Sequence, residues 1–271
     1  MHPTHTTFPA VSVLVFAAFS SGCASTSTPG PGPGPSPGPG PAASSTCNAT
    51  AAKWHAAEES VQPTKDGEDR IQLRHIVIDA TPDPKTLTAV QRLASVEALT
   101  GRTIDAWRAD AVAFSADEGG FTGFGIDVTF NGCNLLQLSS SVGMVGAYPS
   151  SEGNDVLIDL RTGRALGADD VFAADKKAAL AAKLQPQLAR AIEEIGKETD
   201  AADLVGDIAD TRVTVEDLAR FQVRDTGLAF DYTFDFPHVI QALEPAPFFL
   251  TWVELAPFLA KDGPMGADGP R

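Results

Sequence analysis

The sequence predicts an α+β protein, with hairpins of antiparallel strands and helices packed on one face of the sheet. Segments with alternating apolar side chains stand at residues 70–80 and 121–130, a pattern typical of half-buried strands. Between them, and again up to residue 197, apolar residues recur at every third or fourth position, which is typical of amphipathic helices. Hairpins with helices inserted between them indicate the α+β class, and 271 residues leave room for two α+β subdomains.

The composition limits the classes of partner. The chain has 35 acidic and 20 basic side chains and a net charge of -15, so no nucleic-acid binding is expected, because phosphate contacts require clustered Lys and Arg. Three cysteines exclude both a disulfide-dense scaffold and an all-cysteine tetrahedral zinc site. Residues 1–46 contain no Asp, Glu, Lys or Arg, so the whole net charge belongs to the rest of the chain.

Residues 1–22 are predicted to be a signal peptide. The apolar run at residues 11–19 is shorter than the roughly 20 residues that span a bilayer, and small residues follow it, as in secretory signals. Ser21-Gly22-Cys23 resembles the bacterial lipobox, in which Cys23 becomes the lipidated N-terminus. The alternative is an ordinary cleaved signal, since Ser20 stands where the lipobox usually has Leu. We expect an exported lipoprotein of the bacterial cell envelope, on its periplasmic face or the cell surface, held to the membrane by lipid alone.

Residues 23–46 are predicted to be the anchor cysteine and a linker. Pro and Gly alternate from Pro29 to Pro41, which leaves no apolar side chain to bury and favours a solvated chain. A collagen helix is excluded because it requires glycine at every third position. We interpret this segment as a spacer between the membrane and a folded domain.

The first subdomain is predicted at residues 47–143. A strand at residues 70–80 precedes helices at residues 85–99 and 103–114, with Gly101 as a stop and Thr103 as a cap. A hairpin follows, whose turn is predicted at Asn131-Gly132, which places Cys133 near a strand end. In an exported chain, Cys47 and Cys133 favour a disulfide; the alternative is two free buried thiols.

The second subdomain is predicted at residues 144–262, followed by a disordered tail at residues 263–271. A strand at residues 155–160 leads to a long helix that ends near Lys197, capped by Asp170 or Asp175 and kinked or split at Pro186. A shorter helical piece follows at residues 201–208. A hairpin at residues 221–234 and a strand at residues 248–253 complete the sheet.

Motifs in this half resemble a known family. Residues 159–172 contain Asp-Leu-Arg-Thr-Gly-Arg-Ala-Leu and then Asp-Asp-Val-Phe, a hairpin with Thr226-Gly227-Leu228 follows, and residues 250–259 read Leu-Thr-Trp-Val-Glu-Leu-Ala-Pro-Phe-Leu. In this order and spacing, residues 121–260 resemble the RsiV/PdaC-like extracytoplasmic domain family. Its members form the sensor part of a lysozyme-responsive anti-sigma factor or stand beside polysaccharide deacetylase domains.

The resemblance implies an envelope-facing module that binds a ligand or a protein. Anti-sigma activity is not implied, because the sequence shows no transmembrane helix with a cytosolic segment, and no deacetylase domain is present. The sequence departs from the family at Gly146-Ala147-Tyr148-Pro149, where Tyr148 replaces a usual His. It departs again in the loop at residues 236–247, which lacks a usual Tyr and glycine.

No catalytic site is predicted. Nucleophile-elbow, zinc-protease and phosphate-loop motifs are absent from the sequence. His55, His75 and His238 show no ligand spacing, and His75, inside a predicted strand, is interpreted as structural. We therefore expect no catalysis, no cofactor and no metal.

Paired acidic residues support the same interpretation. Asp155 with Asp159, and Asp231 with Asp235, would lie about 13 Å apart along a strand, too far to act on one bond. Asp169-Asp170 is interpreted as a helix cap rather than a calcium site. The alternative is a hydrolase of wall glycan or peptide that uses carboxylates not recognisable by motif.

Binding residues are predicted in two connections, where such residues concentrate. The alternative is that Phe236, Phe248 and Trp252 fill the core, which is favoured for Trp252 because it lies inside a predicted strand. The acidic domain favours a cationic protein such as a lysozyme, and peptidoglycan is the other expected partner. The candidate binding residues are Tyr148, Pro149, Phe236, Pro237 and His238.

Overall fold

The structure, a computed structural model, describes residues 50–63, 70–114, 120–145, 150–197, 206, 208–234, 236, 243–266 and 269. The predicted signal segment, Cys23, the Pro/Gly spacer and Cys47 lie outside the described residues. Among the residues described, no helix is long and apolar enough to cross a membrane.

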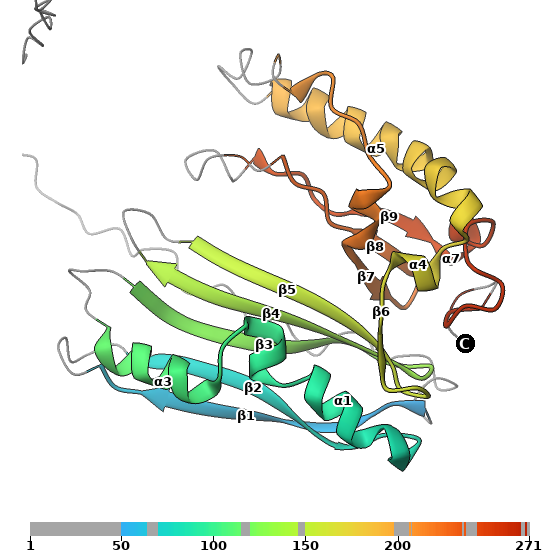
Figure 1. The fold of residues 1–271 in the computed structure, drawn as a ribbon. Helices are drawn as coiled ribbons and strands as arrows, with labels where there is room; N and C mark the ends of the chain where they lie inside the picture. Colours follow the sequence, from blue (N-terminus) through green and yellow to red (C-terminus); the bar gives the residue numbers. More distant parts are fainter. Residues whose placement is uncertain are drawn as a thin grey trace, which may run out of the picture. The chain divides into compact units, whose positions relative to one another are not determined.

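The N-terminal half of the domain forms a six-stranded mixed sheet (Figure 1). Neighbouring strands are antiparallel except for β2 and β3, which run parallel, with Leu73 opposite Phe124. The parallel pair arises because the chain crosses over through helices between the two strands. In order across the sheet the strands are β1 (Lys53–Val61), β2 (Ile71–Ala80), β3 (Gly120–Gly132), β4 (Leu135–Val145), β5 (Ser150–Asp159) and β6 (Arg164–Leu166).

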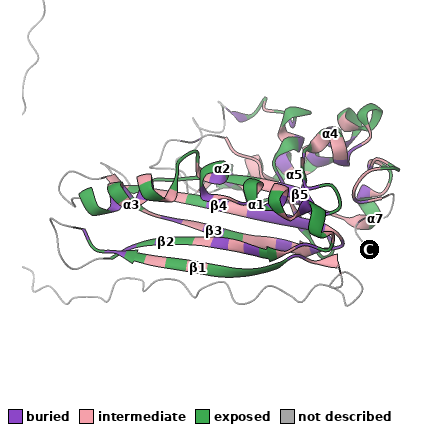
Figure 2. Ribbon diagram, turned by 60° about the horizontal axis from the view of Figure 1, so that its bottom comes forward, coloured by how far each residue is buried: buried purple, intermediate pink, exposed green. Residues whose placement is uncertain are grey.

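The crossover helices cover one face of this sheet (Figure 2). They are α1 (Leu87–Leu93), α2 (Val96–Thr100) and α3 (Ile104–Ala113), preceded by a 3-10 turn at Pro84–Thr86. The predicted helix at residues 85–99 is divided because the Ser95 hydroxyl accepts from Ala98 N and starts a new helix. Gly101 ends α2 with a φ of 74° and Thr103 caps α3, both as predicted. Trp107 stacks on Phe121 in the core beneath them.

The hairpin between β3 and β4 turns two residues later than predicted. Gly132 pairs with Leu135, so Cys133 and Asn134 form the turn, with φ of 51° and 60°. The Asn131 side chain instead bonds Ala52, accepting from its N–H and donating to its carbonyl oxygen, both at 2.9 Å. Asn134 N donates to the Thr50 carbonyl oxygen at 3.2 Å. The start of the described chain is therefore fastened beside the turn that contains Cys133.

A three-stranded antiparallel sheet and a second set of helices form another core. The sheet has the order β7 (Phe221–Arg224), β8 (Gly227–Phe230) and β9 (Phe248–Thr251). Its apolar residues pack with α5 and with residues of the large sheet, among them Phe130, Leu135 and Leu157. The helices are α4 (Ala168–Val171), α5 (Lys177–Lys197) and α7 (Trp252–Leu255), with 3-10 turns at Ala174–Lys176 and Glu216–Ala219. The predicted α+β class is confirmed.

Several boundaries differ from the predicted ones. The subdomain boundary at residues 143/144 falls inside β4, and β5 and β6 continue the same sheet. The assignment of residues 263–271 to a disordered tail does not hold for Met265, which is 3% exposed in the second core. Pro186 lies inside α5 without splitting it. Trp252 starts a helix rather than continuing a strand, and is partly buried against the second core.

Two glutamine side chains close the two edges of the small sheet. At β7, Gln137 donates to Phe221 O at 2.8 Å and accepts from Val223 N at 2.6 Å. At β9, Gln187 donates to Phe249 O at 3.0 Å and accepts from Phe249 N at 3.1 Å. Each amide takes the place of a neighbouring strand, so these parts of the edges cannot pair with another chain. Gln137 is 1% exposed and lies on β4, so it also joins the small sheet to the large one.

Replacing Gln137 by Leu should cost roughly 2 to 5 kcal/mol of unfolding free energy, because it leaves two buried backbone groups without partners. Replacing Gln187 by Leu is the matched control, since it removes the same pair of bonds at a partly exposed edge, where water replaces them at a cost below about 1 kcal/mol. Urea unfolding of both variants measures the difference. Equal losses would show that the burial of Gln137 contributes nothing.

Candidate functional site

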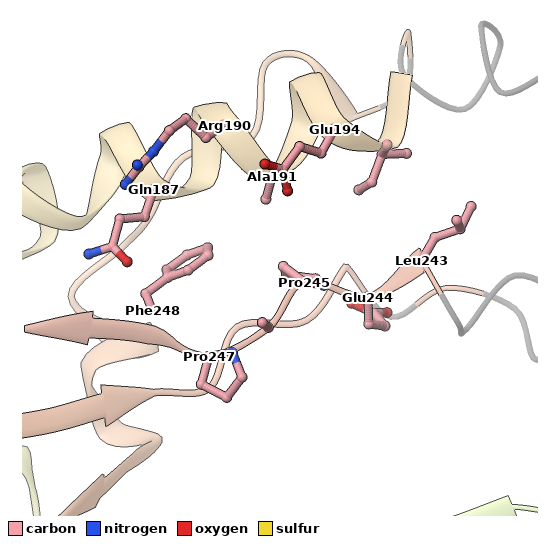
Figure 3. A pocket seen from close by; sticks show the side chains of 11 residues that line it. Gln187, Arg190, Ala191, Glu194, Leu243, Glu244, Pro245, Pro247 and Phe248 are labelled. Atoms are coloured by element: carbon pink, nitrogen blue, oxygen red, sulfur yellow. The ribbon is translucent and has the colours of Figure 1, made fainter. Parts of the chain in front are cut away.

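A cavity of about 490 Å³ lies between α5 and the segment that leads into β9 (Figure 3). One wall is the C-terminal half of α5 and the other is the chain from Leu243 to Phe248. We call this cavity the α5 cleft. Its lining residues are Gln187, Arg190, Ala191, Glu194, Ile195, Leu243, Glu244, Pro245, Ala246, Pro247 and Phe248.

The helix wall is held in place by its apolar face and by Gln187. Leu184, Leu188 and Ile195 are buried against the cores, and the amide of Gln187 bonds both backbone groups of Phe249. Arg190 and Glu194 stand one turn apart and are exposed. Figure 3 shows the Glu194 side chain reaching to the side of Ala191 and the Arg190 side chain extending along the helix toward Gln187.

The opposite wall is shaped by a carboxylate and two prolines. The Glu244 carboxylate accepts from Phe234 N at 2.7 Å and from Phe236 N at 2.9 Å. These bonds hold the segment before β9 against the segment that follows β8. Pro245 and Pro247 restrict the backbone between Glu244 and β9. Phe248 is buried at the base of this wall and stacks on Tyr232 with ring centroids 5.6 Å apart.

Some polar side chains of the cleft are hydrogen-bonded to the backbone and others are not. The side chains of Gln187 and Glu244 are occupied by backbone partners. Within the part of the chain that the structure describes, the side chains of Arg190 and Glu194 form no hydrogen bond or ion pair. The cleft therefore offers one free cation and one free anion beside a surface that combines polar and apolar groups.

The predicted binding residues have different positions. Tyr148, Pro149, Pro237 and His238 lie outside the described residues. Phe236 is 9% exposed and packs with Ile195 and Ile208, so it is a core residue. The second half of the same predicted loop does line the α5 cleft. Arg190 and Glu194 were missed because charged residues on the polar face of a helix normally face solvent, and nothing in the sequence separates these two from the rest.

His75 lies beside a second cavity, of about 420 Å³, between β2 and the first two helices. Burial lowers the pKa of His75, and the nearby Glu59 carboxylate opposes this shift. Its Nδ1 is buried and has no hydrogen-bond partner among the residues that the structure describes. Buried apolar residues change faces at this position, with Leu73 before it and Ile76 after it. A structural histidine would be expected to have its buried ring nitrogen hydrogen-bonded, so the interpretation of His75 as structural stays a prediction.

The acidic pairs follow a different pattern from the predicted one. Asp159 is buried and binds Arg161 through its backbone N at 2.9 Å and its side chain at 3.0 Å. Asp235 lies outside the described residues. Asp170 accepts from Gly167 N at 2.9 Å, so it closes the first turn of α4 and leaves α5 without this cap. In the described chain, no three His, Cys, Asp or Glu side chains are grouped as metal ligands.

Asp155 and Asp231 are instead brought together from the two sheets. Gln222 Nε2 donates to Asp155 at 3.3 Å and to Asp231 at 3.2 Å, and the Arg224 guanidinium holds the Gln222 amide oxygen. Burial raises the pKa of the half-buried Asp231, and the charge of Asp155 raises it further. A carboxyl group with a raised pKa beside an exposed carboxylate is a pattern found in hydrolases. Here, however, an amide group stands between the two, and neither residue lines the α5 cleft.

The fold resembles that of solved proteins from two bacteria. No protein-family model matches the chain, and no curated protein matches it. Two crystal structures of DUF3298 family proteins share the fold, at sequence identities that establish nothing beyond it. The protein from Bacteroides fragilis is 17% identical with a TM-score of 0.52, over 79% of this chain and 95% of that one. The protein from Pseudomonas aeruginosa is 14% identical with a TM-score of 0.53, over 77% of this chain and 94% of that one.

Asp231→Asn should make the domain more stable at neutral pH. Because the pKa of Asp231 is raised above its usual 3.8, the folded state holds a proton that the unfolded state has lost, and stability falls as pH rises through the raised pKa. An Asn side chain stays neutral and avoids this loss. Urea midpoints at about pH 3 and about pH 7 measure the effect: the gain should be present at neutral pH and nearly absent in acid.

Asp225→Asn is the control for Asp231→Asn, since Asp225 is an exposed aspartate of the same hairpin. It should leave the pH dependence unchanged. If both variants behave alike, the burial of Asp231 and its closeness to Asp155 do not govern this part of the stability curve.

Proposed function

We propose that the protein is an exported binding module, anchored in the bacterial envelope, that binds a protein or a cell-wall ligand in the α5 cleft without catalysing a reaction. The observation that carries this proposal is that Arg190 and Glu194, which form no hydrogen bond or ion pair among the described residues, line a cavity together with apolar side chains. Cavities in which a few polar groups converge beside apolar side chains are the usual form of ligand sites. The kinship with RsiV/PdaC-like sensor domains belongs to the same proposal, and the shared DUF3298 fold is compatible with it.

Two classes of ligand agree with the charges. The net charge of -15 favours association with a cationic protein such as a lysozyme, because opposite charge raises the rate of encounter. Peptidoglycan offers peptides with both carboxylate and ammonium groups, which suit Arg190 and Glu194. The two classes predict opposite effects of the Arg190 charge, since its removal favours a cationic protein and disfavours a carboxylate.

The Asp155 and Asp231 pair favours the rival function, hydrolysis of wall glycan or peptide. Their different environments are what an acid and its partner carboxylate require. A substrate would first have to displace the Gln222 amide that bonds both carboxylates. We therefore place binding first and hydrolysis second.

The purified domain should retain a lysozyme or isolated peptidoglycan in a pull-down, and Ala191→Trp should abolish this binding, because an indole at Ala191 fills the cleft whatever the ligand charge. Ala189→Trp is the matched control on α5, since Ala189 is exposed and does not line the cleft. Thermal unfolding should confirm that both variants are folded.

Recovery of neither ligand by the parent protein would overturn the binding proposal. Turnover of wall glycan or peptide that is lost in Asp231→Asn or Asp155→Asn would establish the rival instead. Equal binding by Ala191→Trp and Ala189→Trp would place the site elsewhere on the domain.

The proposed export and anchoring of the protein depend on its cysteines. We propose that Cys23 is lipidated and that Cys47 pairs with Cys133. The backbone supports the pairing, because Asn134, next to Cys133, bonds Thr50, which is three residues from Cys47. A disulfide here would fasten the spacer to the hairpin turn and constrain the unfolded chain, which is worth roughly 2 to 4 kcal/mol.

Chain isolated from bacterial membranes should contain no free thiol. Iodoacetamide should add nothing before reduction and two groups after it, because lipidated Cys23 cannot react. Growth with a radiolabelled fatty acid should label the parent chain but not Cys23→Ala. Alkylation without reduction would contradict the disulfide, and equal fatty-acid labelling of the two chains would contradict the anchor.

A further inference from the structure

The guanidinium of Arg190, like that of Arg92, has no carboxylate partner among the described residues. Most other arginines of the large sheet and its helices pair with carboxylates, as Arg74 does with Asp127 at 2.6 Å and Arg108 with Glu59 at 2.6 Å. In a chain with 35 acidic residues, Arg190 nevertheless remains unpaired among the described residues, although Glu194 stands one helical turn away. A guanidinium left free beside a cleft is a ready site for a carboxylate.

The polar side chains of the cleft that are already bonded to the backbone make a glycan an unfavourable ligand. A glycan presents many hydroxyl groups, each of which needs a partner when it is buried. Gln187 and Glu244 are the other side chains of the cleft with hydrogen-bonding groups, and both are committed to the backbone. The free side-chain groups are thus one cation and one anion, which match a ligand with one carboxylate and one ammonium group on an aliphatic body.

The extended wall adds backbone groups of its own. Ala246 stands between two prolines, is exposed, and makes no backbone hydrogen bond in the part of the chain described. Its N–H and carbonyl can therefore pair with one residue of an extended peptide, as an added strand does. Ala191, Ile195 and Phe248 provide an apolar surface for small aliphatic side chains.

We infer that the α5 cleft binds the free C-terminal end of a short peptide with small aliphatic residues, with its carboxylate on Arg190 and a neighbouring ammonium group on Glu194. This inference rests on the proposed function and deepens it. The same chemistry is present in the stem peptides of the cell wall and at the C-terminus of a protein.

The probe is Nα-acetyl-Lys-Ala-Ala, made with D-alanines and with L-alanines, with the C-terminal amides as matched controls. The full domain should bind a free acid, by calorimetry, at least about tenfold more tightly than the matching amide, because the amide cannot form a charge-assisted bond. Arg190→Ala should weaken binding of the acid about tenfold and leave the amide unaffected, whereas Arg190→Lys should restore part of the difference. Glu194→Gln should remove the preference for Lys over norleucine in the peptide.

Arg92→Ala is the control variant, since Arg92 is exposed on α1 and far in sequence from the cleft. Its guanidinium forms no hydrogen bond or ion pair in the described chain. Equal binding of acid and amide, or no effect of Arg190→Ala, overturns the inference. If neither peptide binds while a lysozyme or peptidoglycan is retained in an Ala191-dependent manner, the proposed function stands and the inference fails. A preference for the D form assigns the ligand to the cell wall, and a preference for the L form assigns it to a protein.

Discussion

Gln137 is the side chain through which the small sheet is attached to the large one. Its amide is buried on β4 and bonds Phe221 O and Val223 N of β7, so the first strand of the small sheet can lie in one register only. Residues that face each other across the two sheets depend on that register. The second core, which includes Phe221, Val223 and Leu135, contains residues of both sheets. The contact of Asp155 with Asp231 through Gln222 also joins the two sheets and depends on the same register. A buried amide that satisfies two backbone groups is costly to replace, because an apolar side chain leaves both without a partner.

Hydrogen bonds between side chains and the backbone also hold the two walls of the α5 cleft, at the β9 edge of the small sheet. Gln187 ties α5 to β9, and Glu244 ties the second wall to Phe234 and Phe236. Both groups are consumed in fixing the walls, so they position the cleft without taking part in recognition. Arg190 and Glu194 then remain as the side-chain charges that a ligand meets. Because the walls are held by backbone bonds and by buried aromatic rings, the cleft is formed before any ligand arrives, which lowers the entropic cost of binding.

The sequence predicted the elements with clear periodicity and missed those that depend on tertiary contacts. The strand around Leu73, the caps at Thr103 and Gly101 and the hairpin of β7 with β8 are where periodicity and turn chemistry place them. Strand β1 was missed because it is an edge strand whose residues are mostly exposed, so apolar alternation is absent. The turn at Cys133-Asn134 was misplaced by two residues because Asn131 is used to bind Ala52. Arg190 and Glu194 have no sequence signal, because what distinguishes them is their position beside the cavity, without a hydrogen bond or ion pair among the described residues.

The two candidate sites differ in what occupies the space between their charges. Between Asp155 and Asp231 stands the Gln222 amide, which donates a hydrogen bond to each carboxylate. Burial, and after it the charge of Asp155, raises the pKa of Asp231. Between Arg190 and the wall at Pro245 and Pro247 there is a cavity of about 490 Å³. The charged groups beside it form no hydrogen bond or ion pair among the described residues, although the charge of Glu194 helps to raise the pKa of Lys197. This difference is the reason why we propose binding at the α5 cleft ahead of catalysis at the acidic pair.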